Sequence, residues 1–125
     1  MTALPSPPHP AAAVSRALDL VTRVRSVRGA MIVSSDDGLV VAEQLMEGIK
    51  GAAVAALAAS LANRLRRAME GAGVGESVFW HLQCDQGALL VVPAASGLLV
   101  VAVADPAVNV GLVRLELLRA AEAVG

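Results

Sequence analysis

An uncharged, alanine-rich segment near the middle of the chain constrains the fold more than any other feature. Residues 50–70 read KGAAVAALAASLANRLRRAME, and the part from Gly51 to Asn63 holds seven alanines and no charged residue. Alanine has the highest helix propensity of all amino acids, so this composition predicts a helix. About twenty residues, each rising about 1.5 Å, form a rod roughly 30 Å long. We therefore expect one long helix at 50–70, with the rest of the chain arranged around it.

This helix carries two apolar stripes, whereas an ordinary amphipathic helix carries one. We expect the bulkier stripe to pack on the chain's own core. We expect the alanine stripe to pack on a partner chain, because small side chains let two helices approach closely and large apolar patches rarely stay in contact with water. The alternative is that another segment of the same chain covers the alanine stripe. The bulkier stripe consists of Val54, Leu57, Ala58, Leu61, Leu65 and Ala68, and the alanine stripe of Ala52, Ala55, Ala56, Ala59 and Asn63.

Length, charge and cysteine content narrow the classes of protein to consider. A chain of 125 residues suits one domain, and a net charge of −1 gives no basic surface for nucleic acid. The single cysteine, Cys84, excludes an intramolecular disulfide and suits a reducing compartment. The N-terminus lacks the basic and then apolar pattern of a secretion signal. These features predict a cytoplasmic location.

One apolar stretch raises the question of a membrane span. Residues 87–104 carry no charge over 18 positions, which is near the lower limit for a spanning helix. Pro93, Ser96 and Gly97 interrupt this stretch, and valines are frequent on both sides of them. Two buried strands joined by a turn explain this pattern better than a helix in lipid, so we expect no membrane span.

The remaining segments predict helices at both ends of the chain and strands between them. Four of the six prolines lie in residues 1–10, which we expect to form an unstructured tail before a single domain at 11–125. Asp37-Gly38 between two apolar runs is typical of a hairpin, and Asn109 is a suitable N-cap for a closing helix. This order predicts an α/β sandwich with a five-stranded antiparallel sheet. The predicted helices span 11–25, 50–70 and 110–124, and the predicted strands span 29–33, 39–42, 76–84, 89–92 and 98–104.

Residues capable of catalysis or metal binding are few and poorly placed. His81 and Cys84 would project from opposite faces of one strand, so they cannot form a nucleophilic pair. Asp36 and Asp37 have no third oxygen ligand at a suitable spacing, and turn formation explains them better than metal binding. We therefore expect no catalytic site, no metal and no cofactor.

Several stretches resemble the Roadblock (dynein light chain) family in their order and spacing. They are the strand at 27–33 with its Asp37-Gly38 hairpin, the alanine-rich helix that ends in the glycines of 71–75, and the stretch 99–106 followed by 109–114. The resemblance covers about residues 14–124. It implies the strand order 2-1-5-4-3, with the long helix on one face of the sheet and the N- and C-terminal helices on the other.

The resemblance also implies a homodimer. Members of this family pair their third strands edge to edge and pack their long helices together, and an unprotected sheet edge invites such pairing. The long helix would contribute the alanine stripe named above. The expected contacts on the edge strand are Ser77, Phe79, His81 and Gln83.

The partner that the resemblance implies is a small Ras-like GTPase. Bacterial relatives of the gliding-motility type stimulate GTP hydrolysis by reshaping the switch loops of the GTPase, without donating an arginine. The docking candidates on the long helix are Ser60, Asn63, Arg64 and Arg67.

Alternatives remain open. The cluster Arg64, Arg66 and Arg67 suits a polar rim around a protein contact, and it equally suits favourable charge at a helix C-terminus. A structural assembly scaffold with no GTPase client is the alternative function. A small-ligand sensor is a third possibility, disfavoured because few polar residues fall on the predicted interior faces. The high alanine and arginine content suggests a bacterial source.

Overall fold

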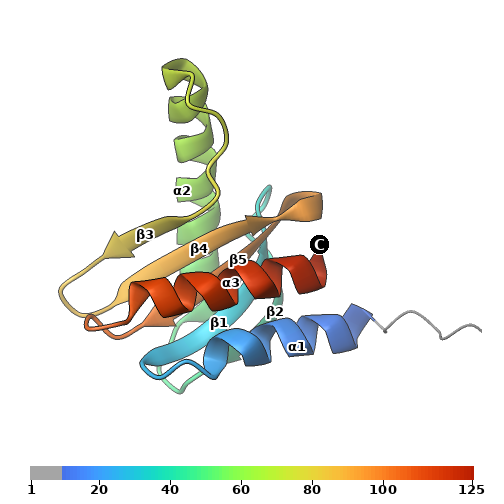
Figure 1. Ribbon diagram of the computed structural model, residues 1–125, viewed down its shortest axis with the longest axis vertical. Helices are drawn as coiled ribbons and strands as arrows, with labels where there is room; N and C mark the ends of the chain where they lie inside the picture. The colour runs from blue at the N-terminus through green and yellow to red at the C-terminus, as the bar shows by residue number, and fades with distance from the viewer. Residues whose placement is uncertain (1–9) are drawn as a thin grey trace, which may run out of the picture.

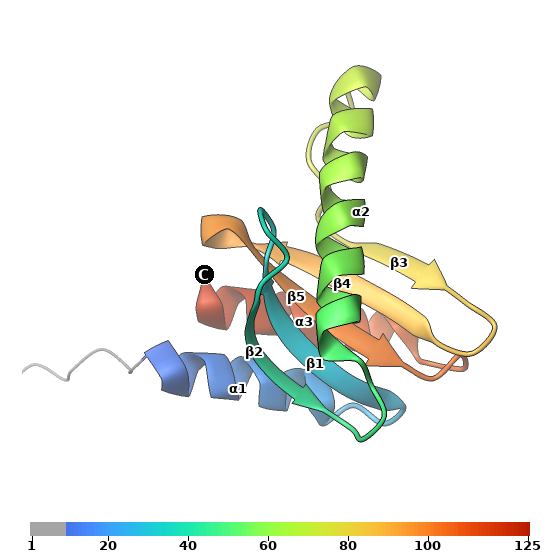
Figure 2. The same cartoon turned by 180° about the vertical axis from the view of Figure 1, so that it is seen from behind.

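The computed structural model describes residues 10–125, which form three layers (Figure 1). The helices are α1 (Pro10–Thr22), α2 (Gly51–Ala72) and α3 (Val110–Val124), and the strands are β1 (Val27–Ser34), β2 (Val40–Leu45), β3 (Trp80–Gln83), β4 (Ala88–Ala94) and β5 (Leu98–Ala104), with a short 3₁₀ turn η1 (Ala95–Gly97). Helix α2 lies on one face of the sheet, and α1 and α3 lie side by side on the other (Figures 1 and 2). The α/β sandwich predicted from the sequence is confirmed.

The sheet has the order β2-β1-β5-β4-β3, and every neighbouring pair is antiparallel. This confirms the strand order that the family resemblance implied. Strands β1 and β5 lie inside the sheet and are apolar on both faces, so most of their residues are buried. Strands β2 and β3 form the two edges.

Two hydrophobic clusters, one on each face of the sheet, hold the layers together. Side chains alternate between the faces of a strand, so Ala30 and Ile32 of β1 pack towards α1 and α3. Met31 and Val33 of the same strand pack towards α2. The alternation explains how one apolar run can serve both layers.

The ends of the terminal helices follow local chemistry. Helix α1 begins at Pro10, because proline suits the first helical position, where the backbone N–H has no helical partner. The tail was predicted at residues 1–10; Pro10 belongs to α1 instead, and residues 1–9 lie outside the described residues. Helix α3 begins where predicted: the side-chain oxygen of Asn109 accepts a hydrogen bond from the N–H of Leu112 at 3.1 Å.

The turn between β1 and β2 also forms as predicted. Asp37 Oδ1 accepts a hydrogen bond from the backbone N–H of Leu39 at 3.0 Å, and Gly38 has a φ of 72°. Two hydrogen bonds lower the pKa of the Asp37 carboxyl below its ordinary value. The bond from the Leu39 backbone has the larger effect, and the bond with the Ser34 side chain has the smaller one. Asp37 thus shapes the turn.

Strand β3 is shorter than the predicted strand at 76–84 and covers four residues. Gly73 and Gly75 have φ angles of 70° and 88°, so the chain turns after α2 and joins the sheet late. The last residue of β4 that pairs with β3 is Val91. Pro93 lies beyond it, where β4 has a single strand neighbour and a missing N–H is tolerated.

The structure corrects the predicted roles of some members of the two stripes on α2, while Ala58 of the bulkier stripe is buried on the chain's own core as predicted. Ala55, Ala58 and Ala59 are buried against the sheet, whereas Leu57 has 46 % of its surface exposed. Small side chains let the helix approach the sheet closely, so the chain itself covers Ala55 and Ala59 and leaves neither to a partner. The alternative of coverage by the same chain is right for these two residues. The exposed members of the alanine stripe are Ala52 and Ala56.

Candidate interaction surface

The outer side of α2 carries residues that one protomer leaves in contact with water. The C-terminal part of the helix projects beyond the sheet (Figure 2). Leu57 is half exposed, although leucine is usually buried. Ser60, Arg64 and Arg67 follow it at spacings of three and four residues, which places all four on one side of the helix. Three of the four predicted docking residues therefore share an accessible face.

The fourth docking candidate, Asn63, points towards the chain's own β1–β2 hairpin. Its Nδ2 donates a hydrogen bond to the carbonyl oxygen of Ser35 at 3.1 Å. Its Oδ1 accepts one from Arg66 Nη2 at 2.9 Å. Asn63 is half-buried and ties α2 to the hairpin, so it does not join the outer face with Ser60.

The neighbouring side of α2 faces β3. Leu65 of the helix and Trp80 of the strand line the same cavity, of about 300 Å³. Trp80 packs in the hydrophobic cluster beneath α2, and Leu82 follows it on the same face of the sheet with 38 % of its surface exposed. Apolar side chains thus run from the outer side of the helix to the edge strand. We name this region the α2–β3 surface, formed by Leu57, Leu61, Leu65, Trp80 and Leu82.

Strand β3 gives this surface an open backbone edge. It pairs with β4 on one side and ends the sheet on the other. His81 and Gln83 are exposed and lie on the face opposite Trp80. His81 Nε2 lies 2.9 Å from Gln83 Oε1, and Gln83 Nε2 donates to the carbonyl oxygen of Pro106 at 2.9 Å. An edge of this kind offers unpaired N–H and C=O groups to another strand.

The other two predicted edge-strand contacts precede β3 and serve the protomer itself. Phe79 is half-buried and packs on the cluster beneath α1 and α3, with the Arg114 guanidinium 5.7 Å from its ring centroid. Ser77 is half-buried and lines the cavity shared by Leu65 and Trp80. Of the four strand residues expected at a dimer contact, only His81 and Gln83 lie on β3.

Sequence reasoning misses Leu57 and Leu82 as exposed residues, and the half-buried Trp80 beside them. The bulk of Leu57 predicts a place in the core. Trp80 and Leu82 fall on the strand face that is not expected to meet a partner. Their alternation does put both on one face, and the structure shows that this face lies beside α2.

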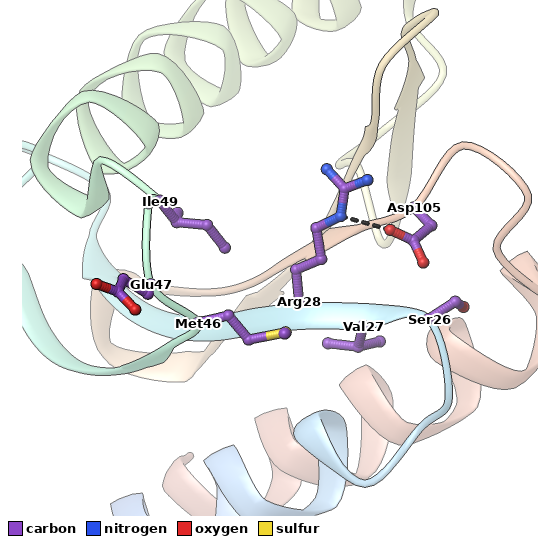
Figure 3. A pocket seen from close by; sticks show the side chains of 8 residues that line it. Ser26, Val27, Arg28, Met46, Glu47, Ile49 and Asp105 are labelled. Atoms are coloured by element: carbon purple, nitrogen blue, oxygen red, sulfur yellow. Dashed lines mark hydrogen bonds and ion pairs between the residues drawn. The ribbon is translucent and has the colours of Figure 1, made fainter.

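A second cavity, of about 560 Å³, lies where β1 begins, β5 ends and the loop enters α2 (Figure 3). Arg28 forms an ion pair with Asp105 there and also donates from Nη1 to the carbonyl oxygen of Gln86 at 3.2 Å. These bonds engage the guanidinium and link β1 to the end of β5. The pair is partly exposed, so its net contribution to stability is at most about 1 kcal/mol.

Residues 10–125 lack two features that would bear on function. No group of three or more histidine, cysteine, aspartate or glutamate side chains there could hold a metal ion. In the same part of the chain, every helix is too short or too polar to cross a membrane.

Comparison with known proteins places this geometry in a family. Residues 14–104 match the family model described as the Roadblock/LC7 domain. The uncharacterised protein MJ1340 of Methanocaldococcus jannaschii is 32 % identical over 111 residues, which cover 89 % of this chain and 96 % of the relative. This relative is archaeal, and the bacterial source suggested by composition stays a prediction.

Solved structures give the same fold. The gliding protein MglB of Thermus thermophilus is similar with a TM-score of 0.81 and 23 % identity, over 99 % of this chain and 94 % of that chain. A structure described as MglB with a tetrameric arrangement is similar with a TM-score of 0.83 and 24 % identity, over 99 % and 93 % of the two chains.

Proposed function

Because this chain belongs to the Roadblock/LC7 family, we propose that it is a homodimer that binds and regulates a small Ras-like GTPase without a catalytic site of its own. The observation that carries this proposal is the α2–β3 surface. It combines half-exposed apolar side chains with an open strand edge on one side of the protomer. The similarity to MglB, a gliding protein, supports a regulatory role over an enzymatic one.

A second copy of the chain suits the α2–β3 surface. Strand β3 of one protomer would pair with β3 of its partner, and the two α2 helices would pack beside one another. Two-fold symmetry makes such a patch its own complement. Leu57, Leu61 and Leu65 would meet across the axis. The segment from Gly51 to Asn63 carries no charge, which is typical of the centre of a protein interface.

The rim of the paired helices, beside Leu57, would then contact the GTPase. Ser60, Arg64 and Arg67 are exposed there, and neither arginine has an ion-pair partner among the residues that the structure describes. Unpaired arginines are available for a protein contact, where arginine is enriched. We propose that the dimer acts on the switch loops of the GTPase, as the family resemblance implies.

Binding to nucleotide-loaded GTPases tests this proposal. Small Ras-like GTPases of the source organism would be loaded with GDP or a GTP analogue and titrated with the protein in biolayer interferometry. The double variant Arg64→Glu/Arg67→Glu removes the proposed contact. The matched control, Arg16→Glu/Arg23→Glu, reverses two exposed arginines at α1, which lies on the other face of the sheet.

We expect tighter binding to the GTP-loaded form, and a loss of about tenfold or more in the α2 variant, because arginines at interface centres are frequent hot spots. The α1 variant should bind like wild type. Light scattering should show an unchanged mass for both variants. If binding depends neither on the bound nucleotide nor on Arg64 and Arg67, the GTPase proposal is rejected. That result would favour an assembly scaffold that uses the same dimer.

A further inference from the structure

The second edge of the sheet, β2, carries a patch of exposed apolar residues that the proposed dimer does not use. Four of the ten large hydrophobic residues that are exposed within residues 10–125 lie on or beside this one strand. Leu39 is 65 % and Val41 is 52 % exposed. Figure 2 shows β2 and β3 at opposite sides of the sheet, so a dimer through β3 would leave this region open. We name this edge the β2 patch, formed by Leu39, Val40 and Val41 at the start of the strand and Met46 just beyond its end.

Within residues 10–125, the backbone of β2 is open on its outer side. Among these residues the strand pairs only with β1, from Val40 to Leu45. A bulge interrupts the pairing beside Val33, and Glu43 projects on the α2 face of the strand. Bulges and charges of this kind discourage aggregation at sheet edges. Protection against aggregation does not require exposed apolar side chains at the edge, yet those of the β2 patch are uncovered.

The charges in the chain segment that carries the β2 patch are acidic. The nearest basic residues are Lys50, which follows the segment, and Arg28, which lines a cavity with Met46 and is paired with Asp105. Between residues 36 and 49 the chain has four carboxylates and no lysine or arginine. The α1 side adds a further carboxylate, because Asp19 Oδ1 accepts a hydrogen bond from Gln44 Nε2 at 3.0 Å. The four carboxylates of the segment are Asp36, Asp37, Glu43 and Glu47.

This charge pattern selects the kind of partner. A second copy paired through β2 would bring its own carboxylates against these, and like charges opposite one another destabilise strand pairing. An extended segment with lysine or arginine beside apolar residues would complement both features. Added strands gain affinity from backbone hydrogen bonds and specificity from alternate side chains. One face of the added strand would contact Glu43. The side chains on that face would fit beside α2, because the exposed helix residues there, Ala52 and Ala56, are small.

We propose that β2 is a docking edge for an extended segment of another protein in which apolar residues alternate with lysine or arginine. The proposal does not depend on the dimer or on the GTPase. It concerns a different edge of the sheet, so either can fail while the other holds.

Two synthetic peptides test the proposal with the full-length protein. One peptide of about ten residues, the length of a long strand, alternates valine with lysine, and the second alternates valine with glutamate. Both carry fluorescein and are titrated by fluorescence anisotropy at low and high salt. Amide chemical shifts of the ¹⁵N-labelled protein locate the binding site. The variants are Glu43→Lys, Glu47→Lys and the double variant Leu39→Lys/Val41→Lys, with Glu70→Lys on α2 as the matched charge control.

We expect the lysine peptide to bind at least tenfold more tightly than the glutamate peptide and to shift the amides of β2. Glu43→Lys and Glu47→Lys should each weaken it about two- to fivefold, as exposed charge pairs do, and Glu70→Lys should not. The double variant should lose binding, since lysines protect a sheet edge. Glu43 lies beside Gly51 at the start of α2, so a lysine at position 43 could disturb the fold. Glu47→Lys tests the same charge effect if the Glu43→Lys protein does not fold.

Four results would overturn the proposal. The two peptides could bind equally, or the shifts could map to β3, or the double variant could bind like wild type. A mass that falls in the double variant relative to wild type would show that β2 binds a second copy, which also contradicts it.

Discussion

Replacing Leu57 by glutamate should dissociate the dimer while leaving each protomer folded. Leu57 is 46 % exposed on the outer side of α2 and contributes little to the core of its own chain. In the proposed dimer, the exposed part of this side chain packs against the partner's α2 helix. A carboxylate at this position would stay hydrated in a monomer and lose its water in a dimer.

The magnitude follows from the exposed surface. Burying a whole leucine side chain contributes about 1.5–3 kcal/mol, so burying the exposed half contributes about 1 kcal/mol in each protomer. Two-fold symmetry doubles this to about 2 kcal/mol, and each 1.4 kcal/mol changes the dissociation constant about tenfold. Leu57→Ala should therefore weaken the dimer about 30-fold. Leu57→Glu should weaken it further, because an unpaired buried charge costs about 3 kcal/mol or more.

Sedimentation equilibrium measures both variants. The protomer mass is 12.7 kDa, and twice this value is about 25 kDa for the dimer. The matched control is Leu112→Glu, because this leucine of α3 is 44 % exposed on the opposite layer. Circular dichroism checks that all variants are folded. If Leu57→Glu and Leu112→Glu sediment alike, the outer side of α2 is not the dimer contact and the reasoning is refuted.

Three further outcomes test the fold. Ala58→Leu should lower the free energy of unfolding by about 1–3 kcal/mol in urea denaturation, because it overpacks a fully buried contact. Ala53→Leu, on the exposed side of α2, should change the free energy of unfolding by less than about 0.5 kcal/mol. Equal effects of the two substitutions would contradict the orientation of α2. Asn109→Ala should cost about 1 kcal/mol through loss of the α3 N-cap, with Asn109→Ser as the control that keeps a capping oxygen. The Asp37 carboxyl should titrate below pH 3.8 by NMR, and a titration at or above 3.8 would show that the Leu39 bond is absent in solution. Because the folded pKa is lowered, the stabilisation from Asp37 is present above the unfolded pKa and is lost as the pH falls through the folded pKa. Asp37→Asn should remove this pH dependence of stability.

The sequence predicts the kind and order of the elements because each one has a local cause, although it predicts β3 as too long a strand. Asp37-Gly38 sets a hairpin and Asn109 caps a helix, and both act over a few residues. The strand order came from the family resemblance. No local rule yields it, since β1 and β5 pair across about seventy residues of intervening chain, as do Arg28 and Asp105, with a separation of 77.

The candidate surface was only partly predictable, because periodicity groups residues by face without showing what each face meets. The spacing correctly separated Ala55 and Ala59 from Leu57 and Leu61. Bulk then suggested that the leucines face the core, but the close approach of α2 to the sheet favours alanine there. Asn63 shared a stripe with Ala59, and its side chain bonds to the hairpin, a contact 28 residues distant in sequence.

Hydrogen–deuterium exchange in β3 tests most directly whether a second copy covers the α2–β3 surface. The amides of Trp80–Gln83 would be followed in the wild-type protein at concentrations above and below the dissociation constant of the dimer, with β5 as the internal reference. If β3 pairs with its counterpart, the exchange of these edge amides slows at high concentration and recovers on dilution. An exchange rate in β3 that is the same at every concentration would contradict the account.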